Sequence, residues 1–395
     1  MAMYQTEFDP GFAEPPMAFM PPPSDSSAER LARLRLIRSR RVGPATYLRL
    51  MAEHGSAAKA LEALPEVARA AGVDSYSVCP EGVALAEMKA AKRAGARMLC
   101  LGDADYPGPL ADISDAPPIL WAIGRQDLLQ RPMLAMVGTR NASSLGARMA
   151  RRLAADLGAA GFVVVSGLAR GIDAMAHKAA LDTGTIAVHA GGVDVIYPEE
   201  NTALAQDIAR TGLRLSEQPP GLDPQARHFP RRNRIVSGLA QAVIVVEAAA
   251  RSGSLITARL ALEQGREVLA VPGHPMDTRA AGGNLLIRDG AVLVRSADDV
   301  IEALGGMPMP HPRPLPAFQT AVMTAPAPVQ SASRPDDGQR MAARIMDLIG
   351  PSPTPEDQVI RDLGISPAAM AQVLADLELE GVLERRPGGM LARTA

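Results

Sequence analysis

Three arginines and one aromatic residue lie within residues 229–234, in the segment Phe-Pro-Arg-Arg-Asn-Arg. The apolar run 242–246 follows almost at once and has the composition of a buried strand. Guanidinium groups cannot be buried beside a strand without partners, so they must face solvent, carboxylates or a polyanion. An arginine fork binds carboxylate or phosphate oxygens, and an aromatic ring can stack on a nucleobase. The segment therefore indicates a polyanion site, or else salt bridges to Glu217, Glu247 or Glu263.

Further arginines lie where other strands are expected to end. Short β-branched runs alternate with helical patterns between residues 132 and 295, which is typical of a parallel sheet covered by helices on both faces. Ligands bind such sheets beyond the carboxyl ends of the strands, where glycine and serine let the backbone approach and helix starts attract anions. Six arginines are expected on this rim: Arg140, Arg170, Arg231, Arg232, Arg234 and Arg251. We therefore expect an anion site wide enough for more than one phosphate.

The chain divides into five segments by composition and periodicity. Residues 79–305 are expected to form an α/β domain, extended, Rossmann-like and doubly wound, with a mostly parallel sheet. Residues 1–26 are predicted to be a disordered tail, and residues 306–337 a Pro-rich linker. Residues 27–78 are predicted to form a helical module of the helix-hairpin-helix or SAM-like type. Residues 338–395 have the pattern of a winged helix, three helices and a β-hairpin.

The helical module carries an arginine cluster just before a Val-Gly-Pro turn at Gly43. This turn is similar to those of helix-hairpin-helix modules, which hold a phosphate on the N–H groups of a helix start. The cluster is either an accessory DNA contact or the solvated face of a small helical bundle, and charge runs are more often solvated faces. Its members are Arg30, Arg33, Arg35, Arg38, Arg40 and Arg41.

Residues for catalysis do not assemble into a recognisable set. The dinucleotide fingerprint G-x-G-x-x-G does not follow the first strand of the alternating region, and the phosphate-loop motif G-x-x-x-x-G-K-[ST] is absent. Asp173 and His177 stand one helical turn apart, but without a third ligand this pair fits a capping or helix–helix hydrogen bond better than a metal site. The two cysteines are too few for a four-thiolate zinc site or a disulfide framework. We therefore expect a binding protein rather than an enzyme, with no catalytic residues, cofactor or metal.

Charge and composition limit the class of binding protein and the cellular location that can be expected. A formal net charge of −2 argues against a globally basic nucleic-acid binder, although it leaves room for a local basic patch. The N-terminus lacks the basic and apolar regions of a signal peptide, and no run of about 18 apolar residues is present. A soluble, cytoplasmic protein without a membrane span is expected.

Seven sequence blocks resemble the DprA (Smf) family of DNA-processing proteins. The resemblance covers about residues 82–295. The first four blocks are Val-Gly-Thr-Arg from Val137, Ser-Gly-Leu-Ala-Arg-Gly-Ile-Asp from Ser166, Tyr-Pro-Glu-Glu-Asn from Tyr197 and Ser-Glu-Gln-Pro-Pro-Gly from Ser216. The other three are Phe-Pro-Arg-Arg-Asn-Arg-Ile from Phe229, Val-Glu-Ala with Arg-Ser-Gly-Ser-Leu-Ile-Thr-Ala from Val246, and Val-Pro-Gly-His from Val271. The resemblance implies a single-stranded-DNA-binding protein of natural transformation, often a homodimer, that helps load the RecA recombinase. It also implies a basic DNA pocket at the strand ends.

The resemblance implies these DNA-binding residues: Gly138, Arg140, Ser143, Ser166, Gly167, Arg170, Gly171, Phe229, Arg231, Asn233, Arg234, Ser252, Gly253 and Ser254. The chain departs from the family pattern at Thr139, where serine is commoner, and in the loop that begins at His189. If residues 229–234 are helical, Arg231 and Arg234 share a face and are assigned to DNA, and Arg232 is left to a structural or interface role.

Two alternatives remain open. Phosphoribohydrolase-like Rossmann enzymes also place glycines and arginines on strand ends, but their Pro-Gly-Gly-x-Gly-Thr-x-x-Glu loop is replaced here by the sequence from Glu247 to Thr257. The winged helix is either a reader of duplex DNA or a protein-binding module. Its third helix, expected at residues 368–379, has no basic residue, which favours partner binding or a weak accessory role.

Overall fold

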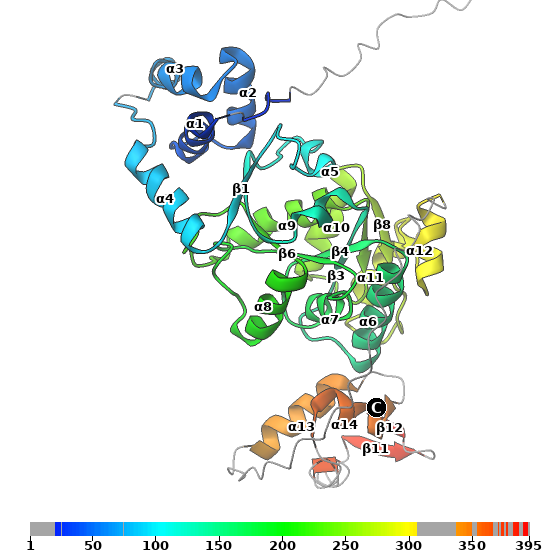
Figure 1. Cartoon of the computed structure of the whole chain (residues 1–395). Coiled ribbons are helices and arrows are strands. Elements are labelled where there is room, and N and C mark those ends of the chain that lie inside the picture. Colours follow the sequence, from blue (N-terminus) through cyan, green and yellow to red (C-terminus); the bar gives the residue numbers. More distant parts are fainter. Residues whose placement is uncertain are drawn as a thin grey trace, which may run out of the picture.

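The computed structural model describes residues 20–24, 26–73, 75–305, 337–349 and 354–365, and, within 370–393, residues 370, 373, 374, 377, 382–386 and 390–393 (Figure 1). Residues 1–19 of the expected tail and residues 306–336 of the expected linker therefore lie outside the described residues. So does most of the expected third helix of the winged helix. The tail prediction is wrong at its end, because Ser24 is buried and its N–H donates to Asp103 Oδ1 at 2.6 Å.

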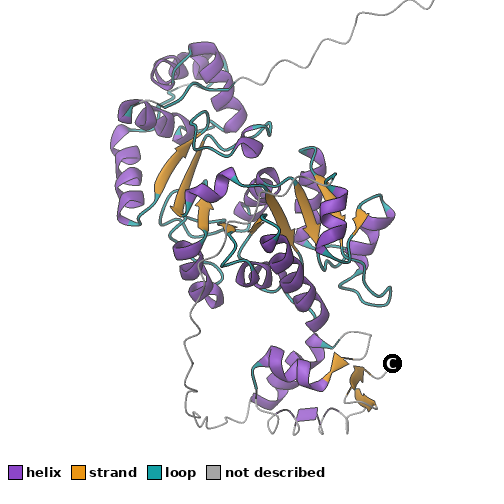
Figure 2. Ribbon diagram, turned by 45° about the vertical axis from the view of Figure 1, so that its right-hand side comes forward, coloured by secondary structure: helices purple, strands orange, loops and turns teal. Residues whose placement is uncertain are grey.

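A nine-stranded sheet forms the centre of the molecule (Figure 2). From edge to edge its strands are β1 (Arg97–Cys100), β2 (Ile119–Gly124), β6 (Leu213–Ser216), β5 (Thr185–Val188), β4 (Val163–Ser166), β3 (Met133–Val137), β7 (Ala242–Val245), β8 (Glu267–Ala270) and β9 (Val292–Leu293). Every pairing from β6 to β9 is parallel, whereas β2 pairs antiparallel with β1 and β6. The predicted doubly wound, mostly parallel sheet is confirmed.

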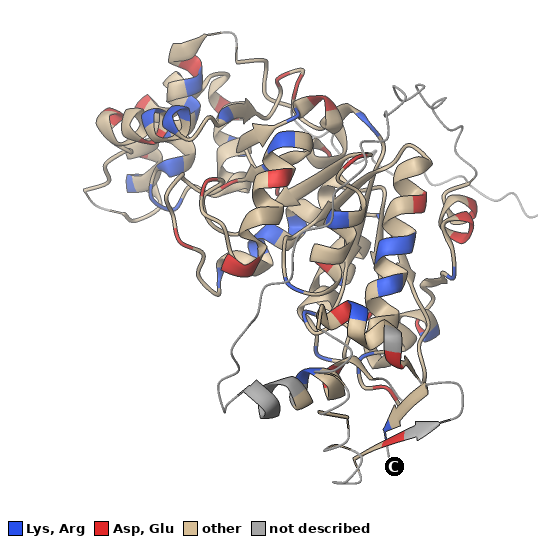
Figure 3. Ribbon diagram, turned by 60° about the horizontal axis from the view of Figure 1, so that its bottom comes forward, with Lys and Arg blue, Asp and Glu red and all other residues tan. Residues whose placement is uncertain are grey.

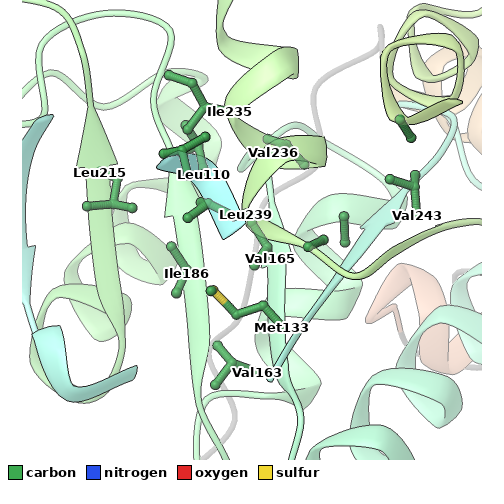
Figure 4. Packing of buried hydrophobic residues seen from close by; sticks show 14 of the residues in the cluster. Leu110, Met133, Val163, Val165, Ile186, Leu215, Ile235, Val236, Leu239 and Val243 are labelled. Carbon is green, nitrogen blue, oxygen red and sulfur yellow. The ribbon is translucent and has the colours of Figure 1, made fainter. Parts of the chain in front are cut away.

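Helices cover both faces of this sheet because successive side chains of each strand point to opposite faces. On one face, Ala135 and Val137 of β3 pack with Ile235 and Leu239, a cluster seen in Figure 4. On the other face, Met136 of β3 packs with residues of three helices. The helices of the domain are α5 (Gly108–Ala111), α6 (Ser144–Ala159), α7 (Ile172–Ala179), α8 (Thr202–Thr211), α9 (His228–Leu239), α10 (Gly253–Glu263), α11 (Ala281–Arg288) and α12 (Ala297–Ala303), with 3-10 turns η1 (Gln126–Gln130) and η2 (Glu199–Asn201).

The N-terminal helices α1 (Ser27–Arg38), α2 (Pro44–His54) and α3 (Ala57–Ala70) enclose a small apolar core of their own. Helix α4 (Glu81–Arg93) joins them to the sheet and packs with residues of β1 and β2. Gly43 caps α2 and Pro44 occupies its first turn, as predicted from the Val-Gly-Pro turn.

Most of the N-terminal arginine cluster fastens this module to the sheet domain. Arg33 is fully buried and donates to the carbonyl oxygen of Leu101 at 2.9 Å. Arg30 pairs with Asp103 at 2.7 Å, and Arg38 pairs with Glu87 at 2.8 Å. These arginines are therefore neither a solvated face nor free for DNA, and both expectations are wrong for them. Only the end of the cluster, Arg40 and Arg41, is exposed.

The C-terminal elements are α13 (Asp337–Leu348), α14 (Glu356–Leu363) and a three-stranded sheet of β10 (Thr354–Pro355), β12 (Met390–Arg393) and β11 (Leu383–Arg386). The hairpin of β11 and β12 was predicted from the sequence, and the winged-helix class is confirmed. Among the described helices, none combines the length and the apolarity that crossing a bilayer requires.

Candidate nucleic-acid interface

A cavity of about 520 Å³ opens beyond the carboxyl ends of β3, β4 and β7, where the fold class predicted a ligand site. The loop after β3 contributes Gly138 and Arg140, and the loop after β4 contributes Gly167. The start of α9 contributes Phe229, and the loop before α10 contributes Arg251. Segments that are far apart in sequence thus converge on one rim. From the predicted set, the lining residues are Gly138, Arg140, Gly167, Phe229, Asn233, Ser252, Gly253 and Ser254.

A second cavity of about 450 Å³ adjoins the first, and Phe229 lies between them because it lines both. Arg140 also lines both cavities, and its guanidinium carbon lies 5.6 Å from the centroid of the Phe229 ring, within cation–π range. On the side of the second cavity, Tyr197 meets Phe229 edge to face with the ring centroids 5.7 Å apart. The Phe229 ring, with the Arg140 cation over it, thus belongs to the wall that the two cavities share.

Arg232 forms the inner wall of both cavities rather than a mobile arm. Its Nη1 donates to the carbonyl oxygen of Gly167 and, at 2.8 Å, to that of Val188. Burial lowers the pKa of its guanidinium, and the nearby Asp173 carboxylate opposes that shift. A side chain at Gly167 would collide with the Arg232 guanidinium, so the close approach requires glycine. The structural role left to Arg232 agrees with this position.

Arg234 is not in the cavity. It is buried, its Nε lies 3.3 Å from Asp115, and its Nη2 pairs with Glu217. The Glu217 partner was one of the predicted salt-bridge alternatives, and that alternative is confirmed. Residues 229–234 are helical as supposed, but Arg231 is exposed and lines neither cavity. Assigning Arg231 and Arg234 to one DNA-facing surface therefore finds no support in their positions.

Ser143 is an N-cap rather than part of the cavity surface. Its hydroxyl donates to Glu247 Oε1 and accepts the N–H of Gly146 at 2.9 Å, and its own N–H donates to Glu247 Oε2 at 3.0 Å. The carboxylate fills the helix start so closely that a side chain at Gly146 would collide with it. Burial raises the pKa of Glu247, and the two bonds from Ser143 oppose the shift. The start of α6 is thus occupied by the chain's own carboxylate.

The loop between β4 and α7 is held by internal hydrogen bonds. Asp173 accepts the N–H groups of Gly167 at 3.1 Å and Ala169 at 3.4 Å, while His177 Nε2 accepts the N–H of Leu168 at 3.3 Å. Burial lowers the pKa of His177 to about 3, so the ring is neutral and can accept. Asp173 and His177 thus make hydrogen bonds as predicted, but to the preceding loop rather than as a helix cap or to a second helix.

Three predicted residues of this same loop region have different positions. Ser166 is fully buried and donates to the carbonyl oxygen of Met136 at 2.6 Å. Gly171 adopts a φ of 71°, and a side chain there would collide with the carbonyl oxygen of Thr139. Arg170 is exposed, lines the second cavity and lies 3.4 Å from Glu200. Only Arg170 of these three therefore has a side chain on the cavity surface.

The loop before α10 also lines the first cavity. Ser252 caps α10, and its hydroxyl lies 2.7 Å from that of Ser254. Arg251 beside them is exposed. Basic residues therefore line the cavity on two of its loops, Arg140 after β3 and Arg251 after β7.

Comparison with known proteins shows which family has this arrangement. The model of the family described as DNA recombination-mediator protein A matches residues 97–305, which is the whole sheet domain. The chain belongs to this family. The model of the DprA-like N-terminal HHH domain matches residues 27–90, and that of the DprA winged helix domain matches residues 325–389. The resemblance to the DprA (Smf) family is thereby confirmed, and with it a DNA-processing role.

Individual relatives are similar to this chain over most of their own length. The DNA processing protein DprA of Bacillus subtilis is 45% identical over 220 residues, which are 55% of this chain and 74% of the relative. Protein Smf of Escherichia coli is 40% identical over 291 residues, 72% of this chain and 74% of the relative. The X-ray structure of DprA from Streptococcus pneumoniae superposes with a TM-score of 0.59 at 36% identity, covering 70% of this chain and 98% of that one.

Sequence reasoning missed some surface residues of this DprA-family site. Tyr197 belongs to one of the seven family blocks, yet only the fold brings it against Phe229. Arg251 is one of the predicted rim arginines but not one of the predicted DNA-binding residues, and it lines the first cavity. Glu247 was considered as a partner for arginine, whereas its partner is Ser143. Within the described ranges, His, Cys, Asp and Glu form no cluster that could hold a metal ion.

Proposed function

We propose that this chain is a non-enzymatic protein that binds single-stranded DNA in the cytoplasm. In this proposal it protects incoming strands and helps load a RecA-type recombinase during natural transformation. Family membership supports the DNA-processing part, and relatives carry the name DNA processing protein DprA. Binding of single-stranded DNA is supported by the position of Phe229, which lines two adjoining cavities together with Arg140.

The geometry suits an unpaired strand. Each of the two cavities has room for a base or sugar, and the ring between them offers a face or edge on which a base can stack. Exposed Arg140, Arg170 and Arg251 can neutralise phosphates along the rim. Stacking and phosphate contacts tolerate any sequence, as a protein that receives arbitrary strands requires.

The test is fluorescence anisotropy of a labelled oligothymidylate with Arg140→Ala combined with Arg251→Ala. Loss of two phosphate contacts should weaken binding and reduce the slope of log K against log salt by about 1.4, since each contact contributes roughly 0.7. Arg210→Ala, an exposed arginine on α8 paired with Asp207, is the matched control and should bind like the wild type. Undiminished affinity in a folded double variant would refute the pocket assignment.

The alternative, an enzyme acting on nucleotides, has less support. In Rossmann-like enzymes a phosphate takes the helix start after the first strand, and here Glu247 already occupies the start of α6. Incubation with nucleoside monophosphates should therefore release no free base, and measurable release by the wild type would favour this alternative.

A homodimer is part of the proposal, and the edge strand β9 supports it. Val292 and Leu293 are exposed by 39% and 42%, and Leu262 of α10 by 61%. An unpaired apolar sheet edge is a ready surface for pairing with a second copy. Static light scattering should give twice the monomer mass for the wild type and the monomer mass for Leu293→Glu, and a monomeric wild type would exclude the dimer.

A further inference from the structure

Helix α6 carries three arginines on one side. Arg151 and Arg152 follow Arg148 by three and four residues, so each lies on the same side of the helix as Arg148. Arg152 pairs at 3.6 Å with Asp156 of the same helix, where both side chains are largely exposed. These three residues are called the α6 arginine face below. Like charges this close repel each other, and an anion relieves the repulsion.

Helix α14 of the winged helix lies against this face (Figure 1). Arg148 Nη1 donates to Gln358 Oε1 at 3.4 Å, and Arg151 Nη2 lies 3.5 Å from Asp362 Oδ1. Gln358 Nε2 donates to the same carboxylate oxygen at 2.8 Å. A carboxylate of the winged helix thus stands where a phosphate oxygen would bind to the arginine face.

This contact has the features of a reversible one. Charge-assisted N–H···O bonds are typically about 2.7–2.9 Å long, and both arginine contacts to α14 are longer. Asp362 Oδ2 is buried and has no hydrogen-bond partner among the described residues, which costs free energy while α14 stays in place. The apolar part of the contact includes Leu348, which lines a cavity of about 200 Å³ together with Leu145 and Met149.

The α6 arginine face also continues from the proposed DNA site. Helix α6 begins at Ser144, a few residues after Arg140, and at a rise of 1.5 Å per residue Arg148 lies about 6 Å further along the helix axis. Figure 3 shows that basic and acidic residues are interspersed over the chain rather than gathered on one side. The arginines of α6 therefore lie on a helix that leads away from the loop of Arg140.

We propose that the α6 arginine face is a second phosphate-binding surface for single-stranded DNA, and that α14 covers it by offering Asp362 in place of a phosphate. A strand held at Arg140 gains the guanidinium contacts that α14 now occupies only when the winged helix leaves. The winged helix thereby limits the length of strand that the protein engages. This inference rests on the proposed single-strand binding, and it assigns the winged helix a role that does not require it to contact DNA.

The test measures oligothymidylate affinity and its salt dependence for Asp362→Lys in the full chain. The new cation repels Arg151, uncovers the face and should raise affinity several-fold, with a salt slope steeper by roughly 0.7 for each additional phosphate that the protein binds. Asp362→Asn, which preserves the shape of the side chain, should act in the same direction with a smaller increase in affinity. Glu66→Lys on α3 is the matched control, because it makes the same change in net charge at an exposed position away from α6.

Adding Arg148→Ala and Arg151→Ala to Asp362→Lys should abolish the increase while wild-type affinity through the cavity remains. An increase as large in Glu66→Lys, or one that survives without the two arginines, would overturn the inference. Failure of the proposed function gives a different result, since the wild type itself would then not bind the strand. Wild-type binding that Arg140→Ala weakens and Asp362→Lys leaves unchanged would refute the covering role of α14 alone.

Discussion

The Glu247 carboxylate accepts two hydrogen bonds from a single residue, Ser143, at the start of α6. Glu247 follows β7 and Ser143 follows β3, so this contact ties together the ends of two neighbouring parallel strands. It also satisfies donors at a helix start that would otherwise attract a phosphate. The contact therefore fixes the relative positions of the loops that follow β3 and β7.

Ser143→Ala should destabilise the fold rather than weaken DNA binding directly. It removes an N-cap, worth about 0.5–2 kcal/mol. It also leaves a buried carboxylate with one donor fewer, at a cost of about 1–3 kcal/mol. Urea unfolding should show a loss in this range, while the folded variant keeps its oligothymidylate affinity. A variant of wild-type stability that has lost DNA affinity would instead make Ser143 a DNA contact.

Arg231→Ala and Arg234→Ala, three residues apart on α9, should differ sharply. Arg234 has a side chain exposed by only 9% and neutralises Asp115 and Glu217, so its removal leaves Glu217 buried without its cation. Breaking such a buried pair costs about 3–5 kcal/mol. Arg231 is exposed, and its removal should change stability by less than about 0.5 kcal/mol. Thermal unfolding of the two variants checks this, and equal midpoints would contradict the ion-pair assignment.

Phe229→Ala should reduce affinity for oligothymidylate by about 1–3 kcal/mol, the value of one stacked base. Phe229→Tyr keeps the ring and should retain most of the affinity, whereas Phe229→Leu keeps apolar volume without the ring and should behave like alanine. Isothermal titration calorimetry separates these cases. A leucine variant that binds like the wild type would show that Phe229 acts through packing rather than stacking.

The sheet and its ligand edge could be predicted from the sequence because their signals are local. β-branched runs that end in glycine mark the strands, and in a parallel sheet such ends meet on one edge. The directions of individual arginines could not be predicted in this way. Arg234 is buried because Asp115 and Glu217 reach it from other parts of the chain, and Arg33 is buried against the carbonyl oxygen of Leu101. The spacing of residues in the sequence does not show which partners from distant parts of the chain will contact an arginine.

Serine in a strand-end loop was ambiguous for a different reason. A hydroxyl there serves a ligand or caps the following helix, and both roles favour the same residue at the same place. Ser143 and Ser252 are caps, whereas only Ser252 also lines the cavity. Burial distinguishes the two roles, and burial depends on the tertiary structure.

Two buried histidines should make the protein sensitive to mild acid. Burial lowers the pKa of His177 to about 3 and that of His189 to about 4, from an ordinary value of 6.5. Below pH 6.5 the unfolded chain therefore binds protons that the folded chain does not, so stability is full above pH 6.5 and falls as the pH drops towards the folded values. Each histidine should contribute a slope of up to about 1.4 kcal/mol per pH unit.

Urea unfolding between pH 7.5 and 5 measures this slope. His177→Gln should lower the free energy of unfolding at every pH, because the hydrogen bonds with Leu168 and Thr185 change. Below pH 6.5 it should also remove the contribution of one histidine to the slope of the unfolding free energy against pH. Above pH 7 neither histidine changes its charge, so the wild type and the variant should run parallel there. An unchanged slope in His177→Gln below pH 6.5 would show that this ring takes up its proton in the folded state as readily as in the unfolded chain.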